Sequence, residues 1–308
     1  MEKYLLTILG SSVDYYLDSD TYPEEGDFSH SRYIGCYAGG CPLNVGAVAA
    51  SKNVSVKALD MLGINDKTTD FLLEKMHEFR IDTDNVCFDK DTVNGKVVII
   101  LTGEKRTMHV INPIRPYYAV DDRLQNVLNN AAYIYSLMHM IHRSFADIEP
   151  LLEAKRHGAK VILDGSSKYD DPSRAQILYD LADGLFINST DYERLKLVSP
   201  KDPAEIILEN GGDFVIVTDG SNGSHLYLKD RQVYAKALSG VEIVDSTGAG
   251  DAFAGCFIAS LLSGYDYEKA LKMATINGAY ACTVFGGQGG VASFDELIRF
   301  AKEHDYDL

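Results

Sequence analysis

Short apolar runs alternate with amphipathic segments through the middle of the chain. The runs are rich in Val, Ile and Tyr and have the length of buried strands; they cover 133–137, 160–164, 184–187 and 214–218. Helices are expected between them, near 144–157, 173–182, 189–198 and 202–210. Continuous apolar strands separated by helices predict a mostly parallel sheet that is covered by helices on both faces.

Two other segments, 11–37 and 92–115, are more polar and richer in Thr and Tyr. They predict a few antiparallel strands that project from the main sheet as a small lid. After residue 218 the pattern predicts two short strands and three helices, at 224–228, 232–235, 250–263, 267–284 and 294–304. Because no repeat and no Pro/Ser-rich linker interrupts the chain, we expect residues 1–308 to form one α/β domain with the lid strands inserted.

The balance of charge narrows the choice of partners. The 308 residues include 29 Lys and Arg against 45 Asp and Glu, which gives a formal charge of −16. Nucleic acids and anionic membranes are recognised by clustered positive charge, so neither is an expected partner. The five cysteines form no CxxC pair, and the chain shows no signal-peptide pattern and no long apolar run. We therefore expect free thiols and a cytoplasmic location.

The segment 245–251, Asp-Ser-Thr-Gly-Ala-Gly-Asp, carries the most specific chemistry. Gly248, Ala249 and Gly250 allow close approach of the backbone at the start of a helix. The first N–H groups of a helix are unpaired and lie at the positive end of its dipole, which suits a phosphate. Asp251 in the first turn could accept a proton from a hydroxyl group beside that phosphate. The alternative is that Asp251 only caps the helix.

The same segment, continued to Phe253, resembles the C-terminal motif D-T-x-G-A-G-D-x-F of the ribokinase-like (PfkB-type) carbohydrate kinases, with Ser246 in place of Thr. The resemblance implies a ribokinase-like fold with a mostly parallel central sheet, helices on both faces and a small β-sheet lid. It implies an anion hole formed by Gly248, Ala249 and Gly250, with Asp251 as the catalytic base. The implied substrates are ATP and a sugar.

On the sugar side, 38–44 resembles the G-G-x-x-x-N motif of that family, which makes Gly39, Gly40 and Asn44 candidate sugar contacts. Ribose-specific members usually carry Lys after the second glycine, whereas this chain has Cys41. Asp14 follows the first strand in the pattern G-x-x-x-D and could accept hydrogen bonds from two sugar hydroxyls. An ordinary Gly-Gly turn and a solvated Asp are the alternatives.

On the nucleotide side, the resemblance assigns cofactor contacts to four segments of the chain. Asn188 and Asp191 stand in place of N-x-x-E near the Mg²⁺ and phosphate region, with Asp191 one methylene shorter than the family Glu. Asn188 could equally cap the following helix. The resemblance also implies K⁺ beside the anion hole, with Asp245 among its ligands.

The segment 215–223 resembles a strand that ends in T-x-G-x-x-G, so Thr218, Gly220 and Gly223 are expected to face ATP. Gly223 would also fit an ordinary turn between strands. Asn277 matches the region that lines the adenine pocket, although its helical spacing is compatible with a core position.

The resemblance therefore predicts transfer of the γ-phosphoryl group of ATP, with Mg²⁺, to a primary hydroxyl of a sugar or sugar derivative. A nucleoside kinase of the same fold, with an aromatic clamp from 15–37, and a non-catalytic sugar sensor are the alternatives. Fructose-type, sugar-acid and glycated-amine substrates stay open, because several polar side chains could approach such groups: Arg106, Arg115, His139 and Lys168. Asp164 matches only the first position of the family pattern D-x-N-x-R. Lid strands in this family often pair between subunits, which makes a homodimer the assembly to test.

Overall fold

The main sheet has eight strands, in the order β14-β13-β12-β11-β10-β9-β1-β4. The computed structural model describes residues 3–308 apart from 9, 104, 112–113, 166–175 and 177–178. Six neighbouring strands pair in parallel, in the sheet order β4, β1, β9, β10, β11 and β12. At the edge next to β12, strands β13 and β14 pair antiparallel. The strands are β1 (Tyr4–Ile8), β4 (Ser55–Leu59), β9 (Tyr133–Leu137), β10 (Lys160–Asp164), β11 (Gly184–Asn188), β12 (Phe214–Thr218), β13 (Ser224–Tyr227) and β14 (Gln232–Ala235).

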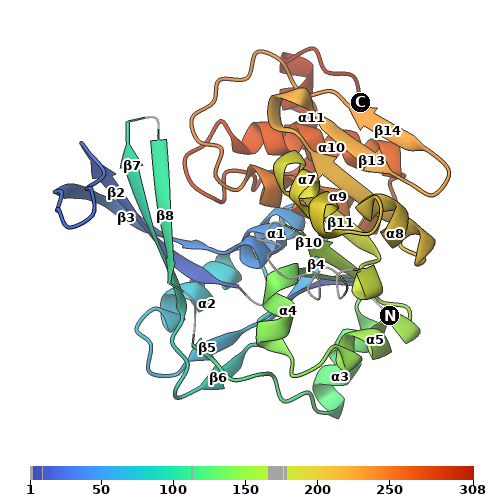
Figure 1. Ribbon diagram of the computed structural model, residues 1–308, viewed down its shortest axis with the longest axis horizontal. Helices are drawn as coiled ribbons and strands as arrows, with labels where there is room; N and C mark the ends of the chain where they lie inside the picture. The colour runs from blue at the N-terminus through green and yellow to red at the C-terminus, as the bar shows by residue number, and fades with distance from the viewer. Residues whose placement is uncertain (1–2, 9, 104, 112–113, 166–175, 177–178) are drawn as a thin grey trace.

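Helices cover both faces of this sheet and form a hydrophobic core on each (Figure 1). Strand β1 shows the division, because Leu5 belongs to one core and Leu6 and Ile8 belong to the other, as alternation along a strand requires. The core with Leu5 contains side chains of α1 (Cys41–Ala50), α2 (Thr69–Glu78), α9 (Ala249–Leu262), α10 (Tyr267–Ala281) and α11 (Phe294–Glu303). The other contains side chains of α3 (Asp122–Asn130), α4 (Met138–Ser144), α5 (Glu149–Arg156), α7 (Ser189–Val198) and α8 (Pro203–Glu209). The predicted sheet with two covered faces is confirmed.

A separate sheet of four strands projects from the main body in the order β3-β2-β7-β8 (Figure 1). It consists of β2 (Ser12–Ser19), β3 (Ser31–Gly39), β7 (Gly95–Thr102) and β8 (Lys105–Ile111). The two expected segments supply it, but the expectation of purely antiparallel pairing is wrong, because β2 and β7 run parallel. Parallel pairing is possible here because a long stretch of chain connects the two strands. A third, two-stranded sheet joins β5 (Met61–Gly63) to β6 (Cys87–Asp89).

The helix expected near 144–157 is shorter than predicted, because α5 begins only at Glu149, with Pro150 in its first turn, where a missing N–H is tolerated. The short helix α4, which ends at Ser144, precedes it and was not predicted. Half of the residues of the helix expected at 173–182 lie outside the described residues. None of the helices in the described parts of the chain has the length and apolar character that a bilayer span requires.

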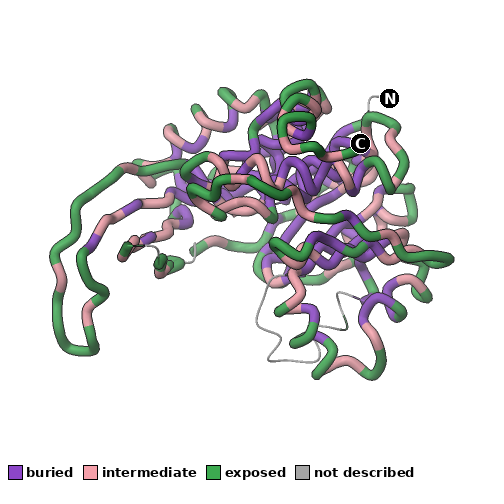
Figure 2. The backbone as a smooth tube through the Cα atoms, turned by 90° about the horizontal axis from the view of Figure 1, so that it is seen from above, coloured by how far each residue is buried: buried purple, intermediate pink, exposed green. Residues whose placement is uncertain are grey.

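The parallel arrangement places the carboxyl ends of the strands at one edge of the main sheet. Residue Asp164 ends β10, Asn188 ends β11 and Thr218 ends β12, and these strands are direct neighbours. This edge is where open α/β sheets bind ligands. In the view from above, the main body is largely buried, while the projecting small sheet is largely exposed or half-buried (Figure 2).

Candidate active site

The start of α9 needs a glycine at its first position. Gly248 is the residue that caps this helix, and its φ of 76° lies in the left-handed region. A Cβ at Gly248 would lie 2.1 Å from the carbonyl oxygen of Gly287, whereas a Cβ at Gly250 would meet nothing within 4 Å. The first-turn N–H groups therefore lie beside open space at the positive end of the helix dipole, which is an arrangement that can bind an anion.

Asp251 lies in the first turn of α9 and is buried, with 8% of its surface exposed. The side chain of Asn44, in the first turn of α1, donates a hydrogen bond from Nδ2 to Oδ2 of Asp251 at 2.8 Å. The two helices pack closely at this point, since a Cβ at Gly255 would lie 2.7 Å from the carbonyl oxygen of Val45. The structure thus joins two residues that are 207 positions apart in the sequence.

Burial raises the pKa of Asp251 to about 7. The hydrogen bond from Asn44 and another from the Cys41 thiol act to lower this pKa, whereas the nearby carboxylates of Asp164 and Asp14 act to raise it further. Burial also raises the pKa of the Cys41 thiol well above its usual range, so Cys41 stays protonated and can donate to Asp251. A carboxyl group with a pKa near neutrality is well suited to accept and return a proton.

The glycines of the 38–44 segment bring Asp14 next to this carboxylate. Gly40 has a φ of 97°, and a Cβ there would lie 1.5 Å from the carbonyl oxygen of Gly10. A Cβ at Gly39 would lie 2.2 Å from Oδ2 of Asp14. Burial raises the pKa of Asp14, and a hydrogen bond of 2.7 Å from the Ser12 hydroxyl opposes this rise. The side chain of Asp14 therefore fits only because residue 39 has no side chain, while Gly40 allows the close approach to the backbone of Gly10.

The sugar-side and catalytic residues predicted from the sequence are thus brought together in the structure. The site also contains Tyr135, whose hydroxyl donates to Oδ2 of Asp164 at 3.2 Å, and the thiol of Cys41. The sequence prediction noted Asp164 as the first position of a family pattern, but it did not assign Tyr135 or the Cys41 thiol to the site. The contact of Cys41 with Asp251 depends on how α1 packs against α9.

The nucleotide-side candidates lie at the ends of β11 and β12. Asn188 caps α7, because its Oδ1 accepts from the N–H of Asp191 at 2.8 Å, as the alternative interpretation predicts. Its Nδ2 donates to Oδ2 of Asp191 at 2.7 Å, and Arg194 donates to Oδ1 at 2.8 Å. Both oxygens of Asp191 therefore already accept hydrogen bonds. The hydroxyl of Ser189 donates to Asp219, which connects the two strand ends.

The three residues of the 215–223 segment have different structural surroundings. Thr218 is half-buried at the end of β12, and Gly220 is exposed with a φ of 52°. Gly223 is a turn glycine, because its φ is 92° and a Cβ would lie 2.3 Å from the carbonyl oxygen of Ala235. Asn277 has no exposed surface, and its amide donates to the carbonyl oxygen of Gly290 at 3.0 Å. In this structure Asn277 supports the loop after α10 from within the core, which is the alternative that its helical spacing allowed.

Asp245, the residue expected to bind K⁺, is surrounded by donors. Its Oδ1 accepts from the N–H and the hydroxyl of Thr247 at 2.9 and 2.7 Å, and its Oδ2 accepts from the N–H of Gly286 at 3.0 Å. Nη1 of Arg106, from β8 of the small sheet, lies 3.4 Å from Oδ1 of Asp245 and donates to the Thr247 hydroxyl. Nothing in the residue pattern indicated that the small sheet reaches this motif.

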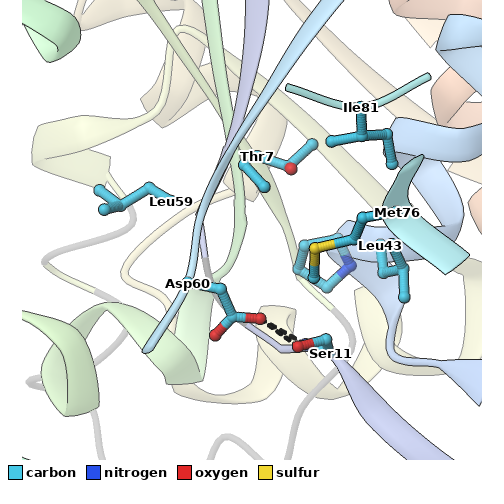
Figure 3. A pocket seen from close by; sticks show the side chains of 9 residues that line it. Thr7, Ser11, Leu43, Leu59, Asp60, Met76 and Ile81 are labelled. Atoms are coloured by element: carbon cyan, nitrogen blue, oxygen red, sulfur yellow. Dashed lines mark hydrogen bonds between the residues drawn. The ribbon is translucent and has the colours of Figure 1, made fainter. Parts of the chain in front are cut away.

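A small pocket lies behind the start of α1 and is distinct from the predicted sugar site (Figure 3). Its polar wall contains Asp60, which accepts hydrogen bonds from the backbone N–H and the hydroxyl of Ser11. The other oxygen of Asp60 is paired with Arg115 at 3.0 Å, and both side chains are 5% exposed. Asp60, which lies between β4 and β5, therefore links Ser11, directly before β2, to Arg115, which follows β8.

Comparison with known proteins gives a consistent result along the chain. Residues 4–293 match the family described as "pfkB family carbohydrate kinase". The chain is 21% identical to a nucleoside kinase of Methanocaldococcus jannaschii over 99% of this chain and 98% of that protein. The structure is similar to that of Arabidopsis thaliana ribokinase complexed with ribose and ATP, with a TM-score of 0.84, 21% identity and coverage of 98% and 99%. It is also similar to a putative ribokinase II from E. coli in complex with ATP and Mg²⁺, with a TM-score of 0.82, 23% identity and coverage of 99% and 100%.

Proposed function

This chain belongs to the pfkB family of carbohydrate kinases, and on that premise we propose that it transfers the γ-phosphoryl group of ATP to a primary hydroxyl group of a sugar or sugar derivative. The observation that carries the proposal is the environment of Asp251. Its carboxyl group is buried at the start of α9, accepts a hydrogen bond from Asn44 and has a pKa of about 7. A base at that place lies beside both an anion-binding helix start and the candidate sugar contact Asp14.

In the proposed reaction the oxygen of the acceptor hydroxyl attacks the γ-phosphorus of ATP, and Asp251 accepts the proton of that hydroxyl. The bond from the γ-phosphorus to the β–γ bridging oxygen breaks, and ADP leaves. Proton transfer of this kind contributes about 10²–10⁴ in rate. The N–H groups at the Gly248–Gly250 turn stabilise the negative charge on the phosphoryl oxygens, because they are already oriented before the reaction begins. Asp14 and Asn44 orient the sugar hydroxyls, and Thr218 and Gly220 contact the nucleotide.

Mg²⁺ is expected to arrive with ATP, where it supplies positive charge to the phosphate oxygens. The described residues hold no cluster of three or more His, Cys, Asp or Glu that could bind a metal ion. Mg²⁺ in phosphoryl-transfer sites needs only one or two carboxylates besides water and phosphate. Asp191 fits that role through a water molecule, because its own oxygens already accept from Asn188 and Arg194.

We also propose that the four-stranded sheet is a lid, inserted in one domain that comprises the whole chain. Its strand β2 carries Asp14, and its strand β8 carries Arg106, which contacts Thr247 just before the anion-binding turn. A lid that covers the bound sugar excludes the water that would otherwise hydrolyse ATP.

The charges around the site favour a neutral or amine-bearing sugar over a sugar acid. Arg106 and Arg115 could in principle bind a substrate carboxylate, but they are ion-paired with Asp245 and Asp60. The carboxylates of Asp14 and Asp164 lie near Asp251 and would repel a negatively charged substrate. Lys168, the third cation expected near the substrate, lies outside the described residues.

A nucleoside kinase is the second candidate, favoured by a cluster of three aromatic rings beside Asp14. Tyr16 and Tyr37 lie 5.4 Å apart between ring centroids, and Phe285 lies 5.0 Å from Tyr16. Tyr37 is paired with Asp14 across β2 and β3 and keeps 39% of its surface exposed. Partly exposed rings at that place could stack on a nucleobase.

The decisive experiment is an ADP-release assay with a panel of acceptors. The panel contains fructose, ribose, a sugar acid, a glycated amine and adenosine, and the Asp251→Asn variant is the control for chemistry at this site. Turnover of a fructose-type or amine-bearing sugar that is lost in the variant supports the proposal, and turnover of adenosine alone supports the second candidate. ATP binding without turnover of any acceptor would contradict both and favour a sensor.

For the assembly we propose a homodimer formed through the small sheet. Its outer strands β3 and β8 have free edges and carry exposed apolar side chains: Tyr33, Ile34, Met108, Val110 and Ile111. An apolar surface of this kind on an open sheet edge is typical of an interface. A second copy of the same sheet would cover it symmetrically.

A further inference from the structure

The position beside Asp245 already holds a positive charge from the chain itself. The β7–β8 hairpin projects from the main body (Figure 1). Arg106 is paired with Leu101 near the end of this hairpin, and its guanidinium reaches Asp245 and Thr247. The described part of the chain shows no other Lys or Arg in an ion pair with Asp245. Rings from both parts hold the contact in place, because Tyr16 of β2 packs against Phe285 of the loop after α10.

Arg106 meets the charge of Asp245 that a metal cation would otherwise meet. Both oxygens of Asp245 accept hydrogen bonds from Thr247 and Gly286, but a carboxylate oxygen has more than one lone pair, so these bonds alone would still leave room for a cation. The guanidinium of Arg106, 3.4 Å from Oδ1, excludes one, because two positive charges at the same carboxylate repel each other. The charge that K⁺ would bring is therefore already present on Arg106.

Asp245 holds the turn at Thr247, directly before Gly248, because its Oδ1 accepts hydrogen bonds from the N–H and the hydroxyl of Thr247. The geometry of the anion-binding turn thus depends on a group that the small sheet supplies.

We propose that Arg106 takes the place of a monovalent cation beside the anion-binding turn, so that phosphoryl transfer by this protein does not depend on K⁺. This inference rests on the proposed kinase function. It means that the positive charge reaches the turn only when the β7–β8 hairpin lies against it. Arg106 is a positioning residue, which acts through Asp245 and Thr247 rather than on the substrate.

The test compares initial rates in potassium chloride and in choline chloride at equal ionic strength. The variants are Arg106→Gln, Arg106→Lys and the matched control Lys105→Gln, which changes an exposed cation next to Arg106 on the same strand. We expect the wild-type and Lys105→Gln rates to be the same in both salts. In choline, Arg106→Gln should lose at least about tenfold in kcat, because the fixed charge supports the anion-binding turn. Part of this loss should be recovered in potassium. Arg106→Lys, which keeps a positive charge, should lose less.

Melting temperatures in the same two salts give a readout that needs no substrate. The wild type should show no shift specific to potassium, whereas Arg106→Gln should be stabilised by potassium because an ion that binds only the folded state raises its stability. Activation of the wild type by potassium would overturn the inference. The inference would also be overturned if Arg106→Gln had the same rate as the wild type, or if potassium changed neither the rate nor the melting temperature of Arg106→Gln. If no acceptor is phosphorylated at all, the proposed function fails, and the melting temperatures still decide the role of Arg106.

Discussion

The raised pKa of Asp251 makes a prediction about the pH dependence of the reaction. A base must be ionised before it can accept a proton, so activity should fall as the pH drops through its pKa. Because burial places this pKa at about 7, kcat/KM for the sugar should show an acid limb near neutrality. An ordinary Asp, with its usual pKa of 3.8, would place the limb far below the neutral range.

The size of the shift also predicts an effect on stability. A rise from 3.8 to about 7 corresponds to about 4 kcal/mol, since one pKa unit is worth about 1.4 kcal/mol. Between these pH values the unfolded chain is ionised at this residue while the folded chain holds the proton, so stability falls as the pH rises. Above pH 7 the folded protein carries the full penalty. Asp251→Asn should therefore be more stable than the wild type at pH 8, by up to about 4 kcal/mol, and the gain should shrink toward pH 4.

Two measurements test this reasoning in the same variant. Turnover should fall by at least about 100-fold, because the base is lost. Chemical denaturation at pH 8 and pH 5 should show a larger gain in stability at pH 8. The variant Asn44→Ala removes the hydrogen bond that lowers the pKa of Asp251. Its acid limb should therefore lie at a higher pH than that of the wild type. An acid limb below pH 5, or near-normal turnover in Asp251→Asn, would refute the argument.

Three further changes test other parts of the site. Asp14→Ala should raise the KM for the sugar far more than the KM for ATP in steady-state kinetics, and equal rises would show that Asp14 is not a sugar contact. Gly248→Ala should destabilise the protein by about 1–3 kcal/mol in chemical denaturation and lower kcat, because the left-handed backbone and the carbonyl oxygen of Gly287 oppose a Cβ. Gly250→Ala is the matched control, since a Cβ there meets open space. An equal loss of stability in the two variants would refute the reasoning. Val110→Lys places a charge on the exposed face of β8 and should shift a dimer to monomers in sedimentation velocity, whereas an unchanged assembly would exclude this face as the interface.

The sequence predicted the features that depend on local constraints. Four central strands of the main sheet were recognisable because each is a compact apolar run, and three of them, β9, β10 and β12, have the expected bounds. The start of α9 was recognisable because Gly248 and Gly250 interrupt an otherwise apolar helix pattern. Local chemistry was enough to predict an anion-binding turn there, and the family resemblance added the role of Asp251.

Contacts between distant segments were not predictable in the same way. Cys41 and Asp251 meet only because α1 packs against α9, and Arg106 meets Asp245 only because the small sheet reaches the main body. Asn277 is a different case: it was expected to contact the nucleotide, but the pattern of a helix does not show whether a polar residue faces a ligand or the core. Its complete burial follows from the packing of α10 and the loop at Gly290.

Helix α9 can hold an unfavourable carboxylate because the rest of the helix contributes so much to the core. Its residues from Ala252 to Ser260 are all buried, so the helix is surrounded on every side. Burial of large side chains such as Phe257 contributes about 1.5–3 kcal/mol each, which offsets the penalty of about 4 kcal/mol at Asp251. The same burial excludes water and keeps the pKa near neutrality. The packing that stabilises the fold is therefore the cause of the basicity on which the proposed reaction depends.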